Sequence, residues 1–388
     1  MFREEIEALE QNGITRTVFR RLDDPKVIPL WFGEGDMATP EVITNAAKDA
    51  LDQGFTFYGH TRGRAELRTA IRAYCNRLYG TDVSFERITV PGSSMLGITL
   101  ATQMTLGQHD HAILITPHWP NIDRAIAVIG AEFSHVRQRC GARGWHLDLD
   151  EVSTAIKPNT RAIYINSPCN PTGWVMQREQ QQELLRICRE RGVVIIADEV
   201  YHRTIYDAEV APSFLEIATE NDPVIVVNGF SKAFAMTGWR LGWMITPSGF
   251  GEQMAVLSEC FNTGAPSFIQ RAGIAALEQG DTAVQQFRAQ YQAGRSAVMA
   301  ILGKHPLVEL TEPEGAFYAF VRIPGLKSSD AFVNSVLDEQ DVGLAPGFTF
   351  GPGNDEYFRL CYAQSNARLR EALGRIVVYL DQHADDYR

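Results

Sequence analysis

A lysine, a serine and an arginine follow one short apolar run in the middle of the chain. The run covers residues 224–227, and Ser231, Lys232 and Arg240 come after it. A lysine just beyond a buried strand is rare unless its amine is paired or used chemically, because desolvation disfavours the charge and lowers the pKa. The same shift makes the amine a nucleophile for aldehydes. Arg240 lies between two glycines, where its forked guanidinium suits a phosphate. Taken alone, Lys232 or Arg240 would be interpreted as an ordinary surface charge. The order of Ser231, Lys232 and Arg240 along the chain instead favours a reactive amine beside a phosphate.

Two other segments have groups that suit anions. Residues 91–95 (PGSSM) join a predicted strand to a predicted helix and include Ser93 and Ser94. Free N–H groups at a helix N-terminus bind a phosphate well. Near the other end of the chain, Arg359 stands inside the apolar run 357–363. A buried arginine needs an anionic partner, and a bidentate carboxylate is its natural match.

Polar or aromatic residues at the ends of further predicted strands have both a functional and a structural interpretation. Asp198 ends the run 193–197, a place where aspartate often caps a following helix. Residues 166–173 (NSPCNPTG) include Asn170 and are typical of a turn. Trp119 follows the end of the run 112–116, which favours a ring that faces a site over a core tryptophan. Ligands gather at the carboxyl ends of parallel strands, so we expect these side chains at one edge of a sheet.

Short β-rich runs alternate with helical patterns through the middle of the chain. The predicted strands cover 88–90, 112–116, 162–165, 193–197, 224–227 and 243–245, and the predicted helices between them cover 94–104, 123–128 and 178–191. This alternation predicts an α/β fold with a mostly parallel sheet flanked by helices. Helical stretches at 40–53, 282–302 and 365–382 predict a smaller domain built from both chain ends. We place the large domain at residues 45–280 and the small domain at residues 1–44 and 281–388.

Composition and charge exclude several classes of protein. Lys and Arg total 36 against 47 Asp and Glu, and the net charge of -11 argues against binding to nucleic acid or anionic membranes. The densest basic stretch, 16–21, is expected to be a solvated turn. Six scattered cysteines without a C-x-x-C motif argue against a disulfide framework and a zinc site, and His109, His111 and His118 suggest a metal only superficially. With no signal peptide and no run of eighteen apolar residues, the prediction is a cytoplasmic protein.

Three motifs, taken in this order along the chain, resemble those of one family. They are NPTG at 170–173, ADEVY at 197–201 and SKAFAMTGWRLGW at 231–243, the last being among the most specific. The chain resembles the class I and II aminotransferases, which are pyridoxal 5′-phosphate (PLP) enzymes of fold type I, and the resemblance covers nearly its whole length. The resemblance implies an aspartate aminotransferase-like fold, with a large PLP-binding domain and a smaller α+β domain.

The resemblance also implies roles for individual residues. Lys232 would carry PLP as a Schiff base and shuttle the proton. The phosphate would be held by Ser231, Arg240, Ser93 and Ser94, while Asp198 would bind the ring nitrogen, Tyr201 and Asn170 the phenolic oxygen, and Trp119 would stack on the ring. A carboxylate against the pyridine nitrogen keeps the ring protonated as an electron sink. Cys169, at a variable position of its motif, receives no role.

Substrate and subunit contacts follow from the same resemblance. Arg359 would bind the substrate α-carboxylate, with the N–H of Gly33 and the side chain of Asn170 beside it. Tyr58 would reach the cofactor phosphate of a neighbouring subunit, which predicts a homodimer with composite sites; its structural alternative is a tyrosine packed in a loop. The chain departs from the family where Gly35 replaces a proline and where Gly229 replaces a hydroxyl residue three positions before Lys232.

The predicted reaction is ping-pong transfer of an amino group from an amino acid to a 2-oxo acid. One alternative is a PLP-dependent C–S (β) lyase on the same fold, since the cofactor supplies the carbanion chemistry to both reactions. A more remote alternative is a non-catalytic PLP-binding regulator, which would normally carry a DNA-binding domain and a basic surface. A Rossmann dehydrogenase is disfavoured, because no G-x-G-x-x-G follows a strand. Side-chain selectivity is expected to come from residues 14–19, the surroundings of Phe32 and the partner chain.

Overall fold

A seven-stranded sheet forms the centre of the larger part of the molecule. The computed structural model describes residues 2–142 and 144–387. In spatial order the strands are β2 (Ile88–Thr89), β10 (Gly242–Ile245), β9 (Val224–Gly229), β8 (Val194–Asp198), β7 (Thr160–Asn166), β3 (His111–Thr116) and β4 (Glu132–Arg137). Strand β10 is antiparallel to both neighbours, and the others run parallel. All six predicted strands are therefore present, in the predicted α/β arrangement.

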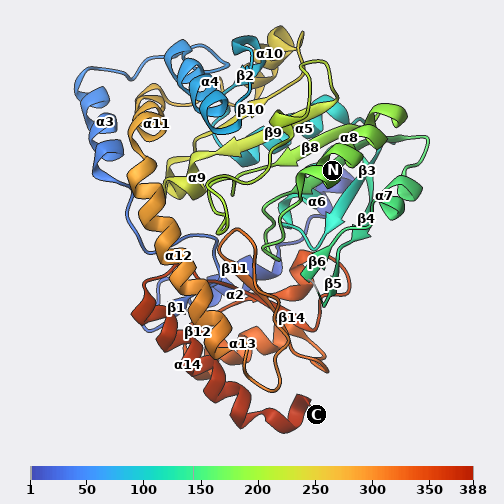
Figure 1. Cartoon of the computed structure of the whole chain (residues 1–388), viewed down its shortest axis with the longest axis vertical. Helices are drawn as coiled ribbons and strands as arrows, with labels where there is room; N and C mark the ends of the chain where they lie inside the picture. Colours follow the sequence, from blue (N-terminus) through green and yellow to red (C-terminus); the bar gives the residue numbers. More distant parts are fainter. Residues whose placement is uncertain (1, 143, 388) are drawn as a thin grey trace.

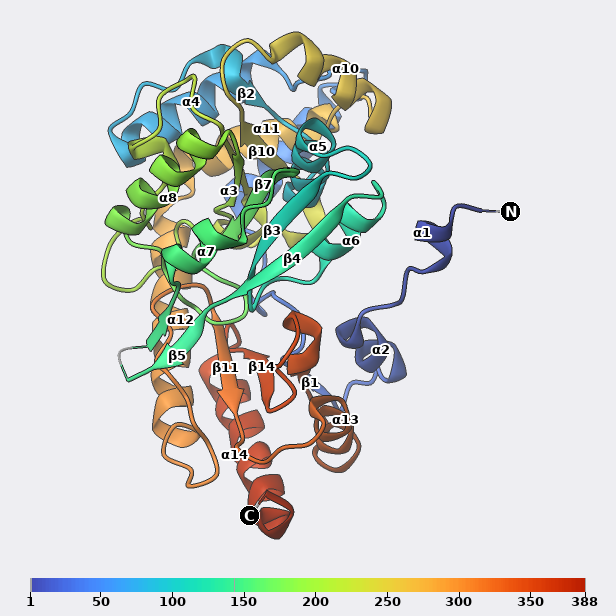
Figure 2. The same cartoon turned by 90° about the vertical axis from the view of Figure 1, so that its right-hand side faces the viewer.

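Helices pack on both faces of this sheet (Figures 1 and 2). They are α3 (Glu41–Asp52), α4 (Ala65–Tyr79), α5 (Ser94–Thr105), α6 (Asn121–Ala127), α7 (Leu149–Ala155), α8 (Arg178–Arg191), α9 (Phe230–Ala233), α10 (Gly251–Phe261) and α11 (Ser267–Gln279). One core cluster, with Ile163, Ile195 and Val226, lies on one face, and a second, with Leu114 and Ile196, lies on the other. This alternation is expected where strands are covered on both sides.

The two chain ends build the smaller part, at the bottom of Figure 1. It contains the antiparallel sheet of β11 (Tyr318–Arg322), β14 (Tyr357–Cys361) and β13 (Ala345–Pro346), and the parallel pair β1 (Ile28–Pro29) and β12 (Val342–Gly343). Its helices are α2 (Gly13–Arg20), α13 (Ser329–Gln340) and α14 (Asn366–Gln382), and α1 (Glu4–Glu7) precedes them. Strands β5 (Arg139–Gly141) and β6 (Gly144–His146) pair in a separate two-stranded sheet. The long helix α12 (Asp281–Ile301) joins the two parts, since Val284 belongs to the large core and Phe287 to the small one.

Two expectations about local organisation are wrong. Helix α3 packs against α11, and its buried Ile43 and Ala47 belong to the large core, so this helix is not part of the small domain. The basic stretch 16–21 is mostly helix α2 and not a turn, because an apolar stripe that includes Val18 packs into the small part. Its arginines form ion pairs there, for example Arg20 with Asp338. The predicted limit at residue 45 therefore falls inside helix α3, and the limit at residue 280 stays a prediction.

All six cysteines are free thiols; Cys75, Cys169, Cys188 and Cys361 are buried, as small hydrophobic residues should be, whereas Cys140 and Cys260 are exposed. Within residues 2–142 and 144–387, none of the helices is both long and apolar enough to span a bilayer.

Candidate active site

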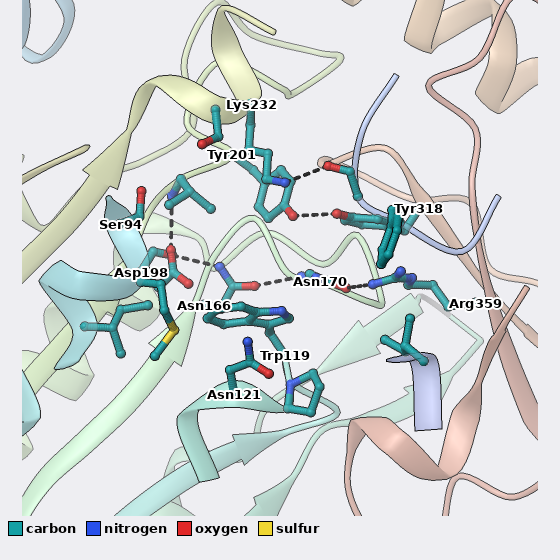
Figure 3. Close-up of a pocket in the computed structure, with 18 of the residues that line it drawn as sticks. Ser94, Trp119, Asn121, Asn166, Asn170, Asp198, Tyr201, Lys232, Tyr318 and Arg359 are labelled. Carbon is teal, nitrogen blue, oxygen red and sulfur yellow. Dashed lines mark hydrogen bonds between the residues drawn. The ribbon is translucent and has the colours of Figure 1, made fainter. Parts of the chain in front are cut away.

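One pocket of about 300 Å³ collects residues from both parts of the molecule. The carboxyl ends of β7, β8 and β9 supply Asn166, Asp198 and Lys232, and the small part supplies Tyr318 and Arg359. Figure 3 shows Asp198 and Arg359 pointing in from opposite sides of this pocket, with Trp119 lying between them. The sheet edge therefore gathers the predicted side chains, as the strand order requires.

Lys232 lies on the short helix α9, directly after β9. Its Nζ donates a hydrogen bond to the carbonyl oxygen of Gly33 at 2.6 Å and stands 5.8 Å from the centre of the Tyr201 ring. Burial among these groups desolvates the amine and lowers the pKa of Lys232 to about 8. The amine is thus neutral over an accessible pH range, as the sequence predicts.

Asp198 ends β8 and is 4% exposed. Its carboxylate accepts hydrogen bonds from the Tyr164 hydroxyl at 2.8 Å and from the Val200 N–H at 3.3 Å. Burial raises the pKa of this carboxyl to about 6, and these two bonds partly offset that effect. No helix begins within the described residues 199–213, so the interpretation of Asp198 as a helix cap is wrong.

The N-terminus of α5 forms another wall of the pocket. Ser93 is the N-cap and its hydroxyl accepts from the Leu96 N–H at 3.1 Å, while Ser94 Oγ donates to the carbonyl of Asn228 at 3.0 Å. Ser94 lines the pocket and Ser93 does not. Orphan N–H groups of this first turn suit an anion, so backbone as well as side chain is available for a phosphate.

Gly229 and Gly242 let α5 approach the sheet closely. A Cβ on Gly242 would lie 2.6 Å from the backbone nitrogen of Ser94, and one on Gly229 would lie 2.1 Å from Ser94 Oγ. The missing hydroxyl at residue 229 therefore has a steric reason, because the Ser94 hydroxyl occupies the space that a side chain there would need.

Ser231 and Arg240 line the pocket together with Lys232. Arg240 adopts a left-handed backbone conformation, with φ of 55°. Its exposed guanidinium donates to the Thr237 carbonyl at 2.8 Å, which leaves most of its N–H groups available to a ligand.

Arg359 is 2% exposed, and its guanidinium donates to Asn170 Oδ1 at 2.9 Å and to the carbonyl of Trp31. The Arg359 Nε has no hydrogen-bond partner, and in residues 2–142 and 144–387 no carboxylate pairs with this side chain. An unpaired buried guanidinium is costly unless a ligand supplies the negative charge. The site therefore suits a carboxylate ligand.

The other predicted residues divide between this pocket and the surface. Trp119, Asn170, Tyr201 and Gly33 all line the pocket. Gly33 offers its carbonyl to Lys232, and contact of its N–H with a substrate stays a prediction. Tyr58 is 91% exposed and lies away from this pocket, so it is not a tyrosine packed in a loop.

Sequence reasoning missed several pocket residues. Tyr318 Oη lies 2.6 Å from Tyr201 Oη, and a Cβ on Gly33 would strike the Tyr318 hydroxyl. Asn166 accepts from the Asn170 N–H at 2.7 Å and donates to the Asp198 carbonyl at 2.9 Å. The position of Asn166 at the end of β7 was a usable signal. Tyr318 gave none, since it reads as a buried strand residue in its local sequence.

One wall of the pocket is neutral. It is formed by Asn12, Ile14, Thr15, Trp31 and Phe32, which include the regions expected to face a substrate side chain. Arg16, the next residue after Thr15, does not line the pocket. Its guanidinium lies 3.9 Å from the carboxylate of Asp330.

Comparison with known proteins agrees with this geometry. Residues 25–376 match the family model described as aminotransferase class I and II. The chain belongs to this family. The aminotransferase is 35% identical to an aspartate aminotransferase of Pyrococcus horikoshii over 93% of each chain. It is 31% identical to the arginine–pyruvate transaminase of Pseudomonas aeruginosa, covering 94% of this chain and 92% of the relative.

A solved structure gives the same result for the fold. The aminotransferase matches the crystal structure of an aromatic aminotransferase from Pyrococcus horikoshii with a TM-score of 0.88 and 32% identity, covering 96% of this chain and 99% of that one. The predicted family, the aspartate aminotransferase-like fold and the transaminase activity are confirmed. No finding favours the lyase alternative.

Proposed function

We propose that this aminotransferase uses PLP, held by Lys232, to move an amino group from an α-amino acid to a 2-oxo acid. The observation that carries the proposal is that one pocket contains both the low-pKa amine of Lys232 and the guanidinium of Arg359, which lacks a carboxylate partner in the described chain. An aldehyde-reactive amine beside a carboxylate receptor is what an amino acid reaction on PLP requires.

The donor set fits PLP along its length. The phosphate end suits the N-terminus of α5 with Ser94, together with Ser231 and Arg240, and Ser93 contributes by capping that helix. The Asp198 carboxylate, buried and ionised above about pH 6, offers an acceptor to the ring nitrogen. Trp119 provides a ring for stacking, and Tyr201 and Asn170, which also line the pocket, would contact the phenolic oxygen. Bound PLP supplies an electron sink for the carbanion that forms at the substrate Cα.

The chain's own residues perform binding, orientation and proton movement. Arg359 aligns the substrate carboxylate, which fixes the direction of the Cα–H bond. Lys232 Nζ, neutral above about pH 8, takes the proton from Cα as general base. Gly33 holds the amine through its carbonyl, and Asn170 joins the Arg359 guanidinium to the loop after β7.

An absorbance spectrum of the purified protein tests the proposal. A pool of amino acids without any oxo acid should bleach the visible band of the bound cofactor to a stable new band, and an added oxo acid should restore it. Lys232→Ala should lack the visible band. Release of ammonia and pyruvate with an unchanged band would favour the lyase, and failure to form the band with added PLP would contradict the role of Lys232.

We also propose a homodimer in which Tyr58 reaches the pocket of a second copy. The neighbouring Phe57 and Tyr58 are 83% and 91% exposed, which is unusual for two adjacent aromatic rings. Sedimentation velocity should give a dimer, and Tyr58→Phe should weaken PLP binding without dissociating it. A monomer that turns over normally would contradict the composite site.

A cytoplasmic location stays a prediction, supported by six free thiols.

A further inference from the structure

Three potential metal ligands meet outside the pocket, on three different elements. His118 follows the end of β3, Asp123 lies on α6, and His135 lies on β4. One ligand atom from each lies within 4.8 Å of the other two. Figure 2 shows β3, β4 and α6 side by side at one edge of the sheet, and β3 pairs with β4. His118 received no metal role from its sequence; His135 comes next to it only through the pairing of β3 with β4.

The polar atoms of this cluster lack hydrogen-bond partners. Both ring nitrogens of His118, Nε2 of His135 and Oδ1 of Asp123 are buried and have none, and His118 is only 1% exposed. Buried polar atoms are nearly always satisfied, so several together require an explanation, and an absent ion is one. Of these four atoms, His118 Nε2 and Asp123 Oδ1 lie against each other, whereas His118 Nδ1 and His135 Nε2 have no hydrogen-bond partner.

The contact between His118 and Asp123 points to a shared third partner. Nε2 and Oδ1 lie 2.9 Å apart, yet they do not form a hydrogen bond with each other. A direct hydrogen bond would align the ring N–H with the carboxylate oxygen. Two ligands of one metal ion instead lie about 3 Å apart while each points at the ion, since metal–ligand distances are about 2 Å.

We propose that His118, Asp123 and His135 bind a divalent transition metal ion of the zinc type. Two imidazole nitrogens and one carboxylate oxygen suit Zn²⁺, Co²⁺ or Fe²⁺, whereas Mg²⁺ and Ca²⁺ prefer oxygen ligands throughout. Three protein ligands leave a fourth position for water. The Asp123 side chain is 27% exposed, which gives the ion a path from solvent.

The site would act on the active site through its neighbour in sequence. Trp119 lines the pocket and directly follows His118. An ion held by all three ligands ties the loop that carries Trp119 to α6 and to the edge strand β4. The ion is therefore a positioning element, and it takes no part in the transfer reaction.

Binding of Co²⁺ to the holoenzyme tests the proposal. The exposed thiols of Cys140 and Cys260 are alkylated first, and bound metal is removed with a chelator. Titration should give one equivalent of Co²⁺ per chain with visible d–d bands, and Zn²⁺ should displace it. His135→Gln and Asp123→Asn should each weaken binding by at least about tenfold. His146→Gln, at an exposed histidine outside the cluster, serves as the matched control.

Thermal unfolding separates lost ligation from a lost fold. Without metal, His135→Gln and Asp123→Asn should unfold close to the wild-type temperature, and Zn²⁺ should raise that temperature for wild type and His146→Gln only, since a ligand stabilises the state that binds it. The proposal is overturned if the wild type shows no saturable binding, or if both cluster variants bind as tightly as the wild type. The latter result would leave His118 and Asp123 as a simple ion pair.

Discussion

The guanidinium of Arg359 donates a hydrogen bond to Asn170 Oδ1 at 2.9 Å, across 189 positions of sequence. This bond joins β14 of the small part to the loop after β7 of the large part. The bond orients the Arg359 guanidinium toward the pocket. It also links Arg359, the proposed receptor for the substrate carboxylate, to Asn170, which is proposed to contact the cofactor.

Arg359→Lys should reduce kcat/KM for amino acids by about 10- to 100-fold. A lysine keeps the charge but loses the fork that binds a carboxylate through two hydrogen bonds, and charge-assisted hydrogen bonds contribute about 1.5–3 kcal/mol. Steady-state kinetics with the best donor measures the effect. Arg370→Lys, at an exposed arginine bonded to Asn366, is the control and should be neutral. A normal kcat/KM in Arg359→Lys would remove the carboxylate role.

The rate of PLP capture should depend on the ionisation of Lys232. Burial lowers the pKa of Lys232 to about 8, and only the neutral amine attacks a carbonyl. The capture rate of cofactor-free protein should therefore rise roughly tenfold per pH unit below about pH 8 and level off above it. Stopped-flow absorbance between about pH 6 and about pH 10 measures this profile.

Glu34 gives that pH profile an internal control. Its negative charge raises the pKa of Lys232, against the larger effect of burial. Glu34→Gln should therefore move the midpoint of the capture rate to lower pH. A rate that keeps rising toward the ordinary pKa of lysine would show that the amine is not desolvated.

Gly229→Ser should destabilise the protein, although it restores the hydroxyl expected from the family resemblance. The backbone of Gly229 is extended, with φ of -172°, so any residue can adopt it and the cost is steric. A Cβ there meets Ser94 Oγ at 2.1 Å, and overpacking of this kind costs about 1–3 kcal/mol. The double variant Ser94→Ala with Gly229→Ser should recover stability and PLP affinity. Unfolding curves that match wild type for Gly229→Ser would refute the steric account.

Neutral amino acids should be better donors than aspartate, by at least about tenfold in kcat/KM. In the described chain every cation that lines the pocket, Lys232, Arg240 and Arg359, already has a proposed role. A second substrate carboxylate would face the neutral wall that contains Thr15 and Phe32, and would lose hydration without gaining a partner. Paired assays of phenylalanine, leucine, glutamine and aspartate with one oxo acid decide this. Aspartate as the best donor would show that another cation enters the site.

The sequence alone determined the sheet, the family and most of the pocket. Its strands are short, β-branched and buried on both faces, so their signal is local, and polar residues at their carboxyl ends must gather at one edge. For this reason the sequence predicted that Asp198, Lys232 and Trp119 line one pocket. The types of residue near Lys232 also predicted its lowered pKa, because desolvation follows from its place after a core strand.

Tertiary structure decided what depends on contacts between distant segments. Tyr318 reads as an ordinary strand residue, and only packing of the small part brings its hydroxyl to Tyr201. Helix α3 carries no local mark of the domain that it joins, since an amphipathic helix can pack on either core. The convergence of His118 and His135 depends on the register of β3 and β4, which is set by long-range pairing and has no expression in the local sequence.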